Sequence, residues 1–183
     1  MRNTHQRMER FLASVERRAF RMARIATGSR EDALDIVQDA MFRLVRRYGG
    51  KSEEEWRPVF FRILQNRIRD HLRRRRFRGL WRVRPGSGNR GDTDPAVDPL
   101  DAVADPNARS PAEQARTEES LRRLEAALRS LPTRQQQVFL LRAWEEMSVK
   151  ETAAVMGCSE GTVKTHFSRA LHTLRGMLED HRP

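Results

Sequence analysis

The chain is poor in several residue types, and each shortage excludes a class of protein. Its 183 residues include a single cysteine, Cys158, so neither an internal disulfide nor a cysteine-rich zinc site can form. The N-terminal residues lack the apolar core of a signal peptide, and no apolar run approaches the ~20 residues that span a bilayer. We therefore expect a soluble, cytoplasmic protein without membrane insertion.

Acidic residues are scarce relative to basic ones. The formal net charge of +11 at pH 7 predicts a polyanionic partner, nucleic acid first and an anionic membrane surface second. The charge is unevenly distributed: residues 62–84 carry ten arginines and one acid, whereas residues 91–113 carry six acids and one base. Because a uniform solubility coat is not patterned in this way, one surface is expected to bind an anion.

The alternation of apolar and polar residues that is typical of strands is absent. Apolar residues instead recur every three to four positions through most of the chain, which predicts an all-α protein. Residues 79–110 are rich in Gly, Pro, Asp and Ala, which is typical of a flexible acidic linker. We therefore expect two small helical domains, at 6–78 and 111–178. The expected helices cover 6–26, 30–48, 53–78 and 111–130, with three shorter ones starting near 133, 148 and 160.

Capping and turn residues mark the ends of these helices. Ser29 is expected to cap the second helix, and Gly157 to form a tight turn before the last one. Pro58 predicts a kink or a break early in the third helix. Capping-box spacing occurs at the pairs Thr133–Gln136 and Ser148–Glu151.

The last expected helix has one apolar side and one side suited to DNA. The apolar side consists of Val163, Phe167, Ala170, Leu171 and Leu174. The opposite side carries Lys164, Thr165, Ser168, Arg169 and His172, whose side chains can contact bases or phosphates. A solvated amphipathic helix would have the same two sides. The caps and the Gly157 turn favour a helix-turn-helix whose last helix enters a major groove.

The third expected helix is basic, and aromatic residues lie among its arginines. This combination suits a partly single-stranded nucleic acid, because bases can stack on exposed rings. In the alternative interpretation Trp56, Phe60 and Phe61 are core residues. Asn66 lies among the arginines, with an amide that could contact a base edge.

The second expected helix has an acidic face made of Asp32, Asp35, Gln38 and Asp39. Carboxylates repel phosphate, so this face is expected either to meet a protein or simply to be solvated. The packing stripe of the same helix is expected to comprise Ala33, Leu34, Ile36, Val37, Ala40, Met41, Leu44 and Val45.

Nothing in the sequence predicts catalysis, a cofactor or a metal site. A glycine-rich phosphate loop is missing, and His166 and His172 have no accompanying set of metal ligands. The acids of the linker lie in a segment too flexible to hold a reacting group. We therefore expect a protein that is not an enzyme.

Four segments together resemble bacterial RNA polymerase sigma factors of the sigma-70 family. The likeness is greatest to the extracytoplasmic-function group, which keeps only regions two and four. The segments are Asp32–Tyr48, Phe60–Arg78, Leu131–Leu141 and Glu160–Arg175. One departure is Thr152, which stands where the family usually has an isoleucine.

The resemblance implies a protein that binds core RNA polymerase, directs it to promoters and assists melting of promoter DNA. It implies that the clamp helices of the largest polymerase subunit meet Asp32, Asp35, Gln38 and Asp39. It implies contact with the −10 element through Trp56, Asn66, Arg67, Arg73, Arg74, Arg75 and Arg76. It implies contact with the −35 element through Thr162, Lys164, Thr165, Ser168 and Arg169. The flap of the second-largest subunit and an anti-sigma protein are further implied partners.

Two rival functions remain open on the sequence. The GTVKTH segment also resembles LuxR-type regulators, which bind an operator without polymerase. A nuclease or recombinase would need carboxylates clustered in a folded segment near the basic face, where only Asp70 is found.

Overall fold

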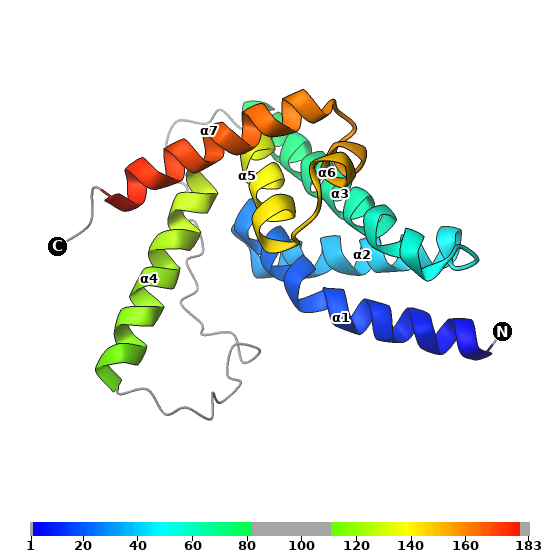
Figure 1. Ribbon diagram of the computed structural model, residues 1–183. Coiled ribbons are helices and arrows are strands. Elements are labelled where there is room, and N and C mark those ends of the chain that lie inside the picture. Colours follow the sequence, from blue (N-terminus) through cyan, green and yellow to red (C-terminus); the bar gives the residue numbers. More distant parts are fainter. Residues whose placement is uncertain (1, 82–110, 180–183) are drawn as a thin grey trace.

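A computed structural model describes residues 2–81 and 111–179, which form helices joined by short turns (Figure 1). The N-terminal module consists of α1 (Arg2–Thr27), α2 (Arg30–Tyr48) and α3 (Glu53–Trp81). The C-terminal module consists of α4 (Pro111–Ser130), α5 (Thr133–Phe139), a π-helical turn (Leu140–Trp144), α6 (Val149–Met156) and α7 (Glu160–Glu179). The all-α prediction is confirmed. The first residues of the expected linker at 79–110 belong to α3, and the rest of the expected linker lies outside the described residues.

Within these two ranges, no helix is both long enough and apolar enough to cross a membrane.

Aromatic rings from α1 and α3 form the centre of the N-terminal module. The Phe11 ring lies 5.9 Å from that of Trp56 and 6.1 Å from that of Phe60, measured between centroids. Phe60 and Phe61 meet edge to face at 5.3 Å. The N-terminal part of α3 is thereby anchored in the core, and the helix continues through Pro58. Of the predicted kink or break at Pro58, the break is wrong, because the helix continues with the buried Trp56 and Phe60 on either side of the proline.

The helix ends follow the predicted caps with one exception. Ser29 accepts a hydrogen bond from the Asp32 backbone, and Ser148 and Glu151 form a reciprocal capping box. The predicted box at Thr133 is wrong, since the N-cap of α5 is Pro132 and makes no side-chain bond. The Gln136 amide instead donates to the Leu128 carbonyl at 2.8 Å and satisfies the end of α4.

The C-terminal module holds α6 and α7 in a fixed turn. Gly157 ends α6 with a φ of +62°, in the left-handed region that glycine adopts most readily. The Arg134 guanidinium donates to the Met156 carbonyl at 3.1 Å, so α5 is tied to the end of α6. Phe139 of α5 stacks on Phe167 of α7 with centroids 6.2 Å apart. These contacts fix the direction in which α7 leaves the turn.

Replacing Thr152 with valine is expected to stabilise the C-terminal module. Thr152 is fully buried in α6, and its hydroxyl has no hydrogen-bond partner among the described residues. Valine removes this polar group and keeps the shape, so a gain of about 1 kcal/mol is expected. Thermal unfolding should show a higher midpoint for Thr152→Val and no gain for the exposed Thr165→Val. A lower midpoint for Thr152→Val would show that the hydroxyl is stabilising.

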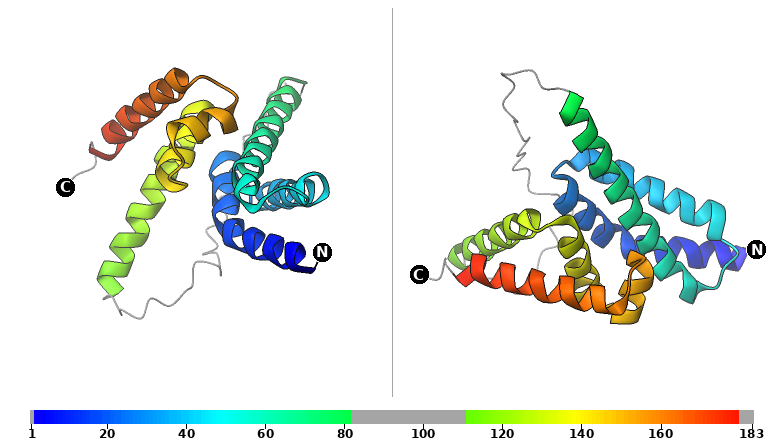
Figure 2. Two further views of the ribbon diagram at one scale, coloured as in Figure 1. Left: turned by 45° about the vertical axis from the view of Figure 1, so that its right-hand side comes forward. Right: turned by 90° about the horizontal axis from the view of Figure 1, so that it is seen from above.

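The two modules pack against each other. Contacts join α3 to α6 and α1 to α4, and the left view of Figure 2 shows α6 next to α3. One interhelical hydrogen bond runs from the Gln137 amide of α5 to the Gln65 carbonyl of α3, at 3.2 Å. We call this set of contacts the closed interface.

Candidate nucleic-acid and protein-binding surfaces

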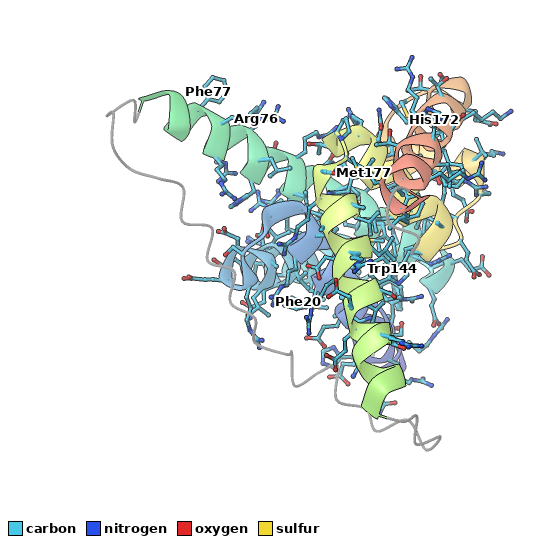
Figure 3. The ribbon with its side chains drawn as sticks, turned by 90° about the vertical axis from the view of Figure 1, so that its left-hand side faces the viewer. Phe20, Arg76, Phe77, Trp144, His172 and Met177 are labelled. Atoms are coloured by element: carbon cyan, nitrogen blue, oxygen red, sulfur yellow. The ribbon has the colours of Figure 1, made fainter. Side chains whose placement is uncertain are left out.

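The outward face of α7 carries most of the residues predicted to contact the −35 element. Lys164, Thr165, Ser168 and Arg169 are exposed on it. Val163, Ala170 and Leu174 are buried on the opposite side. Figure 3 shows His172 projecting from the same helix into solvent. The predicted apolar and polar sides of this helix therefore correspond to its buried and exposed sides.

Two hydroxyls at the start of α7 are already engaged. Thr162 is half-buried, and its hydroxyl lies 2.9 Å from that of Ser159. The Thr165 hydroxyl donates to the Gly161 carbonyl at 3.0 Å, but its oxygen can still accept a bond. Lys164 and Arg169 are thus the long side chains on this face that are available to contact bases or phosphates.

The C-terminal end of α3 presents a run of exposed arginines. Arg73, Arg74, Arg75 and Arg76 are all exposed, and Figure 3 shows Arg76 and Phe77 at the free end of the helix. Arg75 also donates to the Thr27 carbonyl at 2.9 Å, which places a cation at the C-terminus of α1. This end of α3 combines positive charge with an exposed ring, as a surface for unpaired bases requires.

The other residues predicted to contact the −10 element are less accessible. Asn66 is half-buried and accepts a hydrogen bond from Arg69. Arg67 is paired with Asp39, so a residue predicted to meet DNA is bonded to one predicted to meet polymerase. Burial, followed by the nearby Arg134, lowers the pKa of Arg69. The face of α3 around Asn66 is therefore crowded with cations and is not freely open.

Trp56 requires a correction. The structure places its ring in the core instead of on the DNA-facing surface, with only 1% of the residue exposed. Its indole N–H donates to the Tyr48 carbonyl at 3.2 Å. The buried ring closes the turn between α2 and α3 and is not accessible to DNA.

The acidic face of α2 is divided between exposed and paired groups. Asp35 and Gln38 are exposed. Asp32 and Asp39 are half-buried, with an Asp32 oxygen 3.6 Å from His71 Nε2 and an Asp39 oxygen 3.3 Å from Arg43 Nε. Two of the four predicted residues therefore face outward, and two contribute to packing within the module.

Apolar side chains accompany the two outward-facing groups. Leu34, Phe42 and Val45 are 40%, 62% and 43% exposed, so the prediction that Leu34 and Val45 pack inward is wrong. The spacing of positions 34, 38, 42 and 45 places them on one side of the helix. We call Leu34, Asp35, Gln38, Phe42 and Val45 the α2 face. Large apolar side chains gathered on an exposed face are typical of a protein-binding surface.

Among the described residues, no cluster of three or more His, Cys, Asp or Glu side chains could hold a metal ion.

Comparison with known proteins identifies the family to which the chain belongs. A model described as Sigma-70 region 2 matches residues 8–78, and one described as Sigma-70, region 4 matches residues 121–174. The RNA polymerase sigma-E factor of Streptomyces avermitilis is 30% identical over 171 residues, which cover 93% of this chain and 84% of that protein. The chain belongs to the sigma-70 family of RNA polymerase sigma factors.

Other relatives agree with this sigma-factor assignment. The sigma-E factor of Streptomyces antibioticus is 31% identical over 148 residues, covering 81% of this chain and 71% of that protein. The extracytoplasmic-function (ECF) sigma factor BldN of Streptomyces coelicolor is 31% identical over 158 residues, covering 84% of this chain and 53% of BldN. This sigma factor therefore falls in the ECF group, as the sequence predicts.

Solved structures share the fold. The sigma factor RpoE of Bartonella quintana, crystallised with the anti-sigma factor NepR, superposes with a TM-score of 0.67 at 21% identity and covers the whole of both chains. CnrH, solved with the cytosolic domain of CnrY, gives a TM-score of 0.59 at 24% identity, over 96% of this chain and 89% of CnrH. At these identities the likeness concerns the fold alone.

Two groups of residues were not found from the sequence. Phe42 is missing from the predicted packing stripe of α2, and only its exposure marks it as a surface anchor. Glu145 is buried between the modules and is paired with Arg18 and Arg57, whose side chains are partly exposed. These three residues are far apart in the chain, and no spacing rule connects them.

Proposed function

We propose that this sigma factor divides promoter recognition among three surfaces. In this proposal the α2 face binds core RNA polymerase, the end of α3 contacts the −10 element and α7 contacts the −35 element. The observation that carries the proposal is that one surface is apolar and carries an acid, Asp35, while the two others carry exposed cations on separate helices. An acidic, apolar face is unsuited to DNA, and arginine-rich faces are suited to it.

The α2 face is proposed to bind the clamp helices of the largest polymerase subunit. Phe42 and its apolar neighbours would supply the buried centre of the contact, and Asp35 and Gln38 would pair with basic or polar groups at its edge. Asp32 and Asp39 would act indirectly, because their bonds to α3 hold α2 in position. The flap of the second-largest subunit is proposed to bind the C-terminal module.

The end of α3 is proposed to bind and help open the −10 element. Arg73, Arg74 and Arg76 would neutralise phosphates, and Phe77 would offer a ring to an unpaired base. Asn66 and Arg67 can reach DNA only after exchanging their present bonds to Arg69 and Asp39. These two residues are therefore proposed as contacts made in the polymerase complex.

Replacing Arg169 with alanine is expected to weaken promoter recognition at the −35 element. The loss of one specific base contact costs about 1–3 kcal/mol. Transcription from the cognate promoter should fall accordingly, with little change on a template that has a scrambled −35 element. The control is Arg122→Ala on α4, where an exposed arginine lies 3.3 Å from Glu118. Unchanged transcription by Arg169→Ala would show that α7 does not read DNA through this residue.

The remaining partners and the location follow from the family. An anti-sigma protein is proposed as a regulator. RpoE was crystallised with the anti-sigma factor NepR, and CnrH was solved with the cytosolic domain of CnrY. The cytoplasm, where polymerase and promoter DNA are found, is the proposed location. The polymerase itself catalyses the reaction, so the sigma factor is proposed to have no catalytic role.

Run-off transcription tests the proposed function. Core RNA polymerase of the source bacterium is incubated with genomic fragments, with and without the purified chain. The proposal predicts transcripts from a discrete set of start sites that depend on both components. A LuxR-type regulator would bind an operator alone and would not give initiation with core polymerase; that result would overturn the proposal.

A further inference from the structure

Four arginines form a line along the outward side of α1. We call them the α1 stripe: Arg10, Arg17, Arg21 and Arg24. Positions 10, 17 and 24 recur every seven residues, which is close to two turns of 3.6 residues, and position 21 lies one turn from 17 and from 24. The first three arginines are exposed and Arg24 is half-buried. Figure 1 shows α1 at the lower edge of the N-terminal module, and the side opposite the stripe carries the buried Val15 and Met22.

The α1 stripe is not neutralised by its own helix. Side chains on a helix meet at spacings of three and four residues, and neither acid of α1, Glu9 or Glu16, has such a spacing to any arginine of the stripe. Arg17, Arg21 and Arg24 instead have these spacings to one another, and like charges so placed destabilise a helix. An anionic partner would relieve this repulsion.

The pairing of the other arginines on α1 makes the contrast clear. Arg7 and Arg18 each pair with a carboxylate from another element. Among the residues that the structure describes, Arg10, Arg17 and Arg24 pair with no carboxylate. Three guanidinium groups spaced along the stripe therefore remain available for a partner outside the described part of the chain.

The chemistry of the α1 stripe fits the phosphates of double-stranded DNA. Among the described side chains of α1, no large apolar one is exposed. The helix therefore lacks a ring on which unpaired bases could stack, and it lacks the free apolar face with which an amphipathic helix enters a membrane. Guanidinium groups bind phosphate oxygens through paired N–H donors. From Arg10 to Arg24 the helix rises about 21 Å, which corresponds to about six base pairs of duplex.

The stripe also lies next to the basic end of α3. Arg75 of α3 donates to the carbonyl of Thr27, the last residue of α1, at 2.9 Å, and Arg24 lies one turn before Thr27. Positive charge thus continues from the end of α3 onto α1. In a chain with a net charge of +11, this continuity favours a long polyanion over a small acidic ligand.

We propose that the α1 stripe binds the phosphate backbone of double-stranded DNA, as a contact additional to the three surfaces proposed above. Phosphates carry no sequence information, so this contact holds and orients DNA without selecting the promoter. Its binding is weak and strongly dependent on salt. The inference is independent of the assignments to the −10 element, the −35 element and polymerase, because a duplex without a promoter is sufficient to measure it.

The salt dependence of duplex binding by the full-length chain tests the inference. Fluorescence anisotropy gives the affinity for a labelled duplex of random sequence at several salt concentrations, without polymerase. One variant combines Arg10→Ala, Arg17→Ala and Arg24→Ala. Each phosphate contact that is lost lowers the slope of log K against log salt by about 0.9, so this variant should lower it by about 2.7. Alanine favours helix, so α1 should remain folded, which circular dichroism verifies.

A matched variant separates a specific surface from general charge. Arg116→Ala, Arg122→Ala and Arg123→Ala together remove the same charge from exposed positions of α4. This control should change the slope by less than about one phosphate contact. An unchanged slope in the folded stripe variant, or equal changes in both variants, would overturn the inference.

Sedimentation with vesicles that contain phosphatidylserine tests the other large polyanion. The reference chain and the stripe variant are expected to bind these vesicles equally. Loss of vesicle binding in the stripe variant, with an unchanged salt slope for the duplex, would assign the stripe to a membrane and overturn the inference. Neither assay contains polymerase or a promoter, so their failure would leave the run-off result of the proposed function standing.

Discussion

Phe42→Glu is expected to weaken the binding of core RNA polymerase by about a hundredfold or more, which corresponds to the ~2.7 kcal/mol typical of a central interface residue. Phe42 is the most exposed apolar side chain of the α2 face and lies between Gln38 and Val45. A carboxylate at this point would have to be desolvated against an apolar partner surface. The measurement is a titration of labelled sigma factor with core polymerase, followed by fluorescence anisotropy.

The control for this variant is Phe77→Glu, which makes the same change at a phenylalanine that is 59% exposed at the other end of the module. It should leave the affinity for core polymerase within a few-fold of the reference, since Phe77 lies on α3 and outside the α2 face. Both variants should keep the reference unfolding temperature, because each replaced ring is largely exposed. Equal affinities of Phe42→Glu and the reference protein would show that α2 is not the polymerase-binding helix.

Trp56→Ala is expected to destabilise the N-terminal module by about 3–5 kcal/mol, as is usual when a buried tryptophan is truncated. The ring is packed against Phe11, and its N–H donates to the Tyr48 carbonyl, so truncation would leave a cavity and remove one hydrogen bond. The carbonyl would keep its bond from the Lys51 backbone N–H. For a module of this size the unfolding midpoint should fall by more than about 10 °C. Thermal unfolding followed by circular dichroism measures the shift.

The comparison variant for Trp56 is Phe77→Ala, in which an exposed ring of the same helix is removed. Its unfolding midpoint should stay close to that of the reference. A stable Trp56→Ala variant with selectively impaired binding of −10 DNA would contradict the core assignment and restore the role that the resemblance implies.

The positions of the helices could be predicted from the sequence, and so could the division of α7 into a buried apolar side and an exposed polar side. Apolar residues at positions 163, 170 and 174 face the core, and the polar residues between them face outward, because a helix in a small module has one buried side. The caps at Ser29 and Ser148 were also predictable, since they depend only on neighbouring residues. Local chemistry decides these features, and local chemistry is visible in the sequence.

The exposure of α2 could not be predicted in the same way. Its apolar residues cover much of the helix surface, and the pattern does not show how wide a strip α1 and α3 cover. Leu34 and Val45 lie outside that strip and are exposed. Trp56 is the opposite case, a residue expected at the surface that is buried. Its aromatic ring suits either a core or a base-stacking surface. Only its packing against Phe11, which in turn contacts Phe60, decides between the two.

The cluster around Glu145 could not be found from the sequence because it depends on the relative placement of the modules. Arg18, Arg57 and Glu145 belong to three separate elements, and each looks like an ordinary surface charge in its own segment. Only tertiary contact makes Glu145 the most deeply buried acid of the closed interface.

The central claim is that promoter recognition by this chain depends on its binding to core polymerase. The most direct measurement is a titration of a fluorescent promoter duplex, selected by run-off transcription, with the chain alone, with core polymerase alone and with both. We predict tight, sequence-dependent binding only when both proteins are present. Tight and specific binding by the chain alone, unaffected by core polymerase, would contradict the claim.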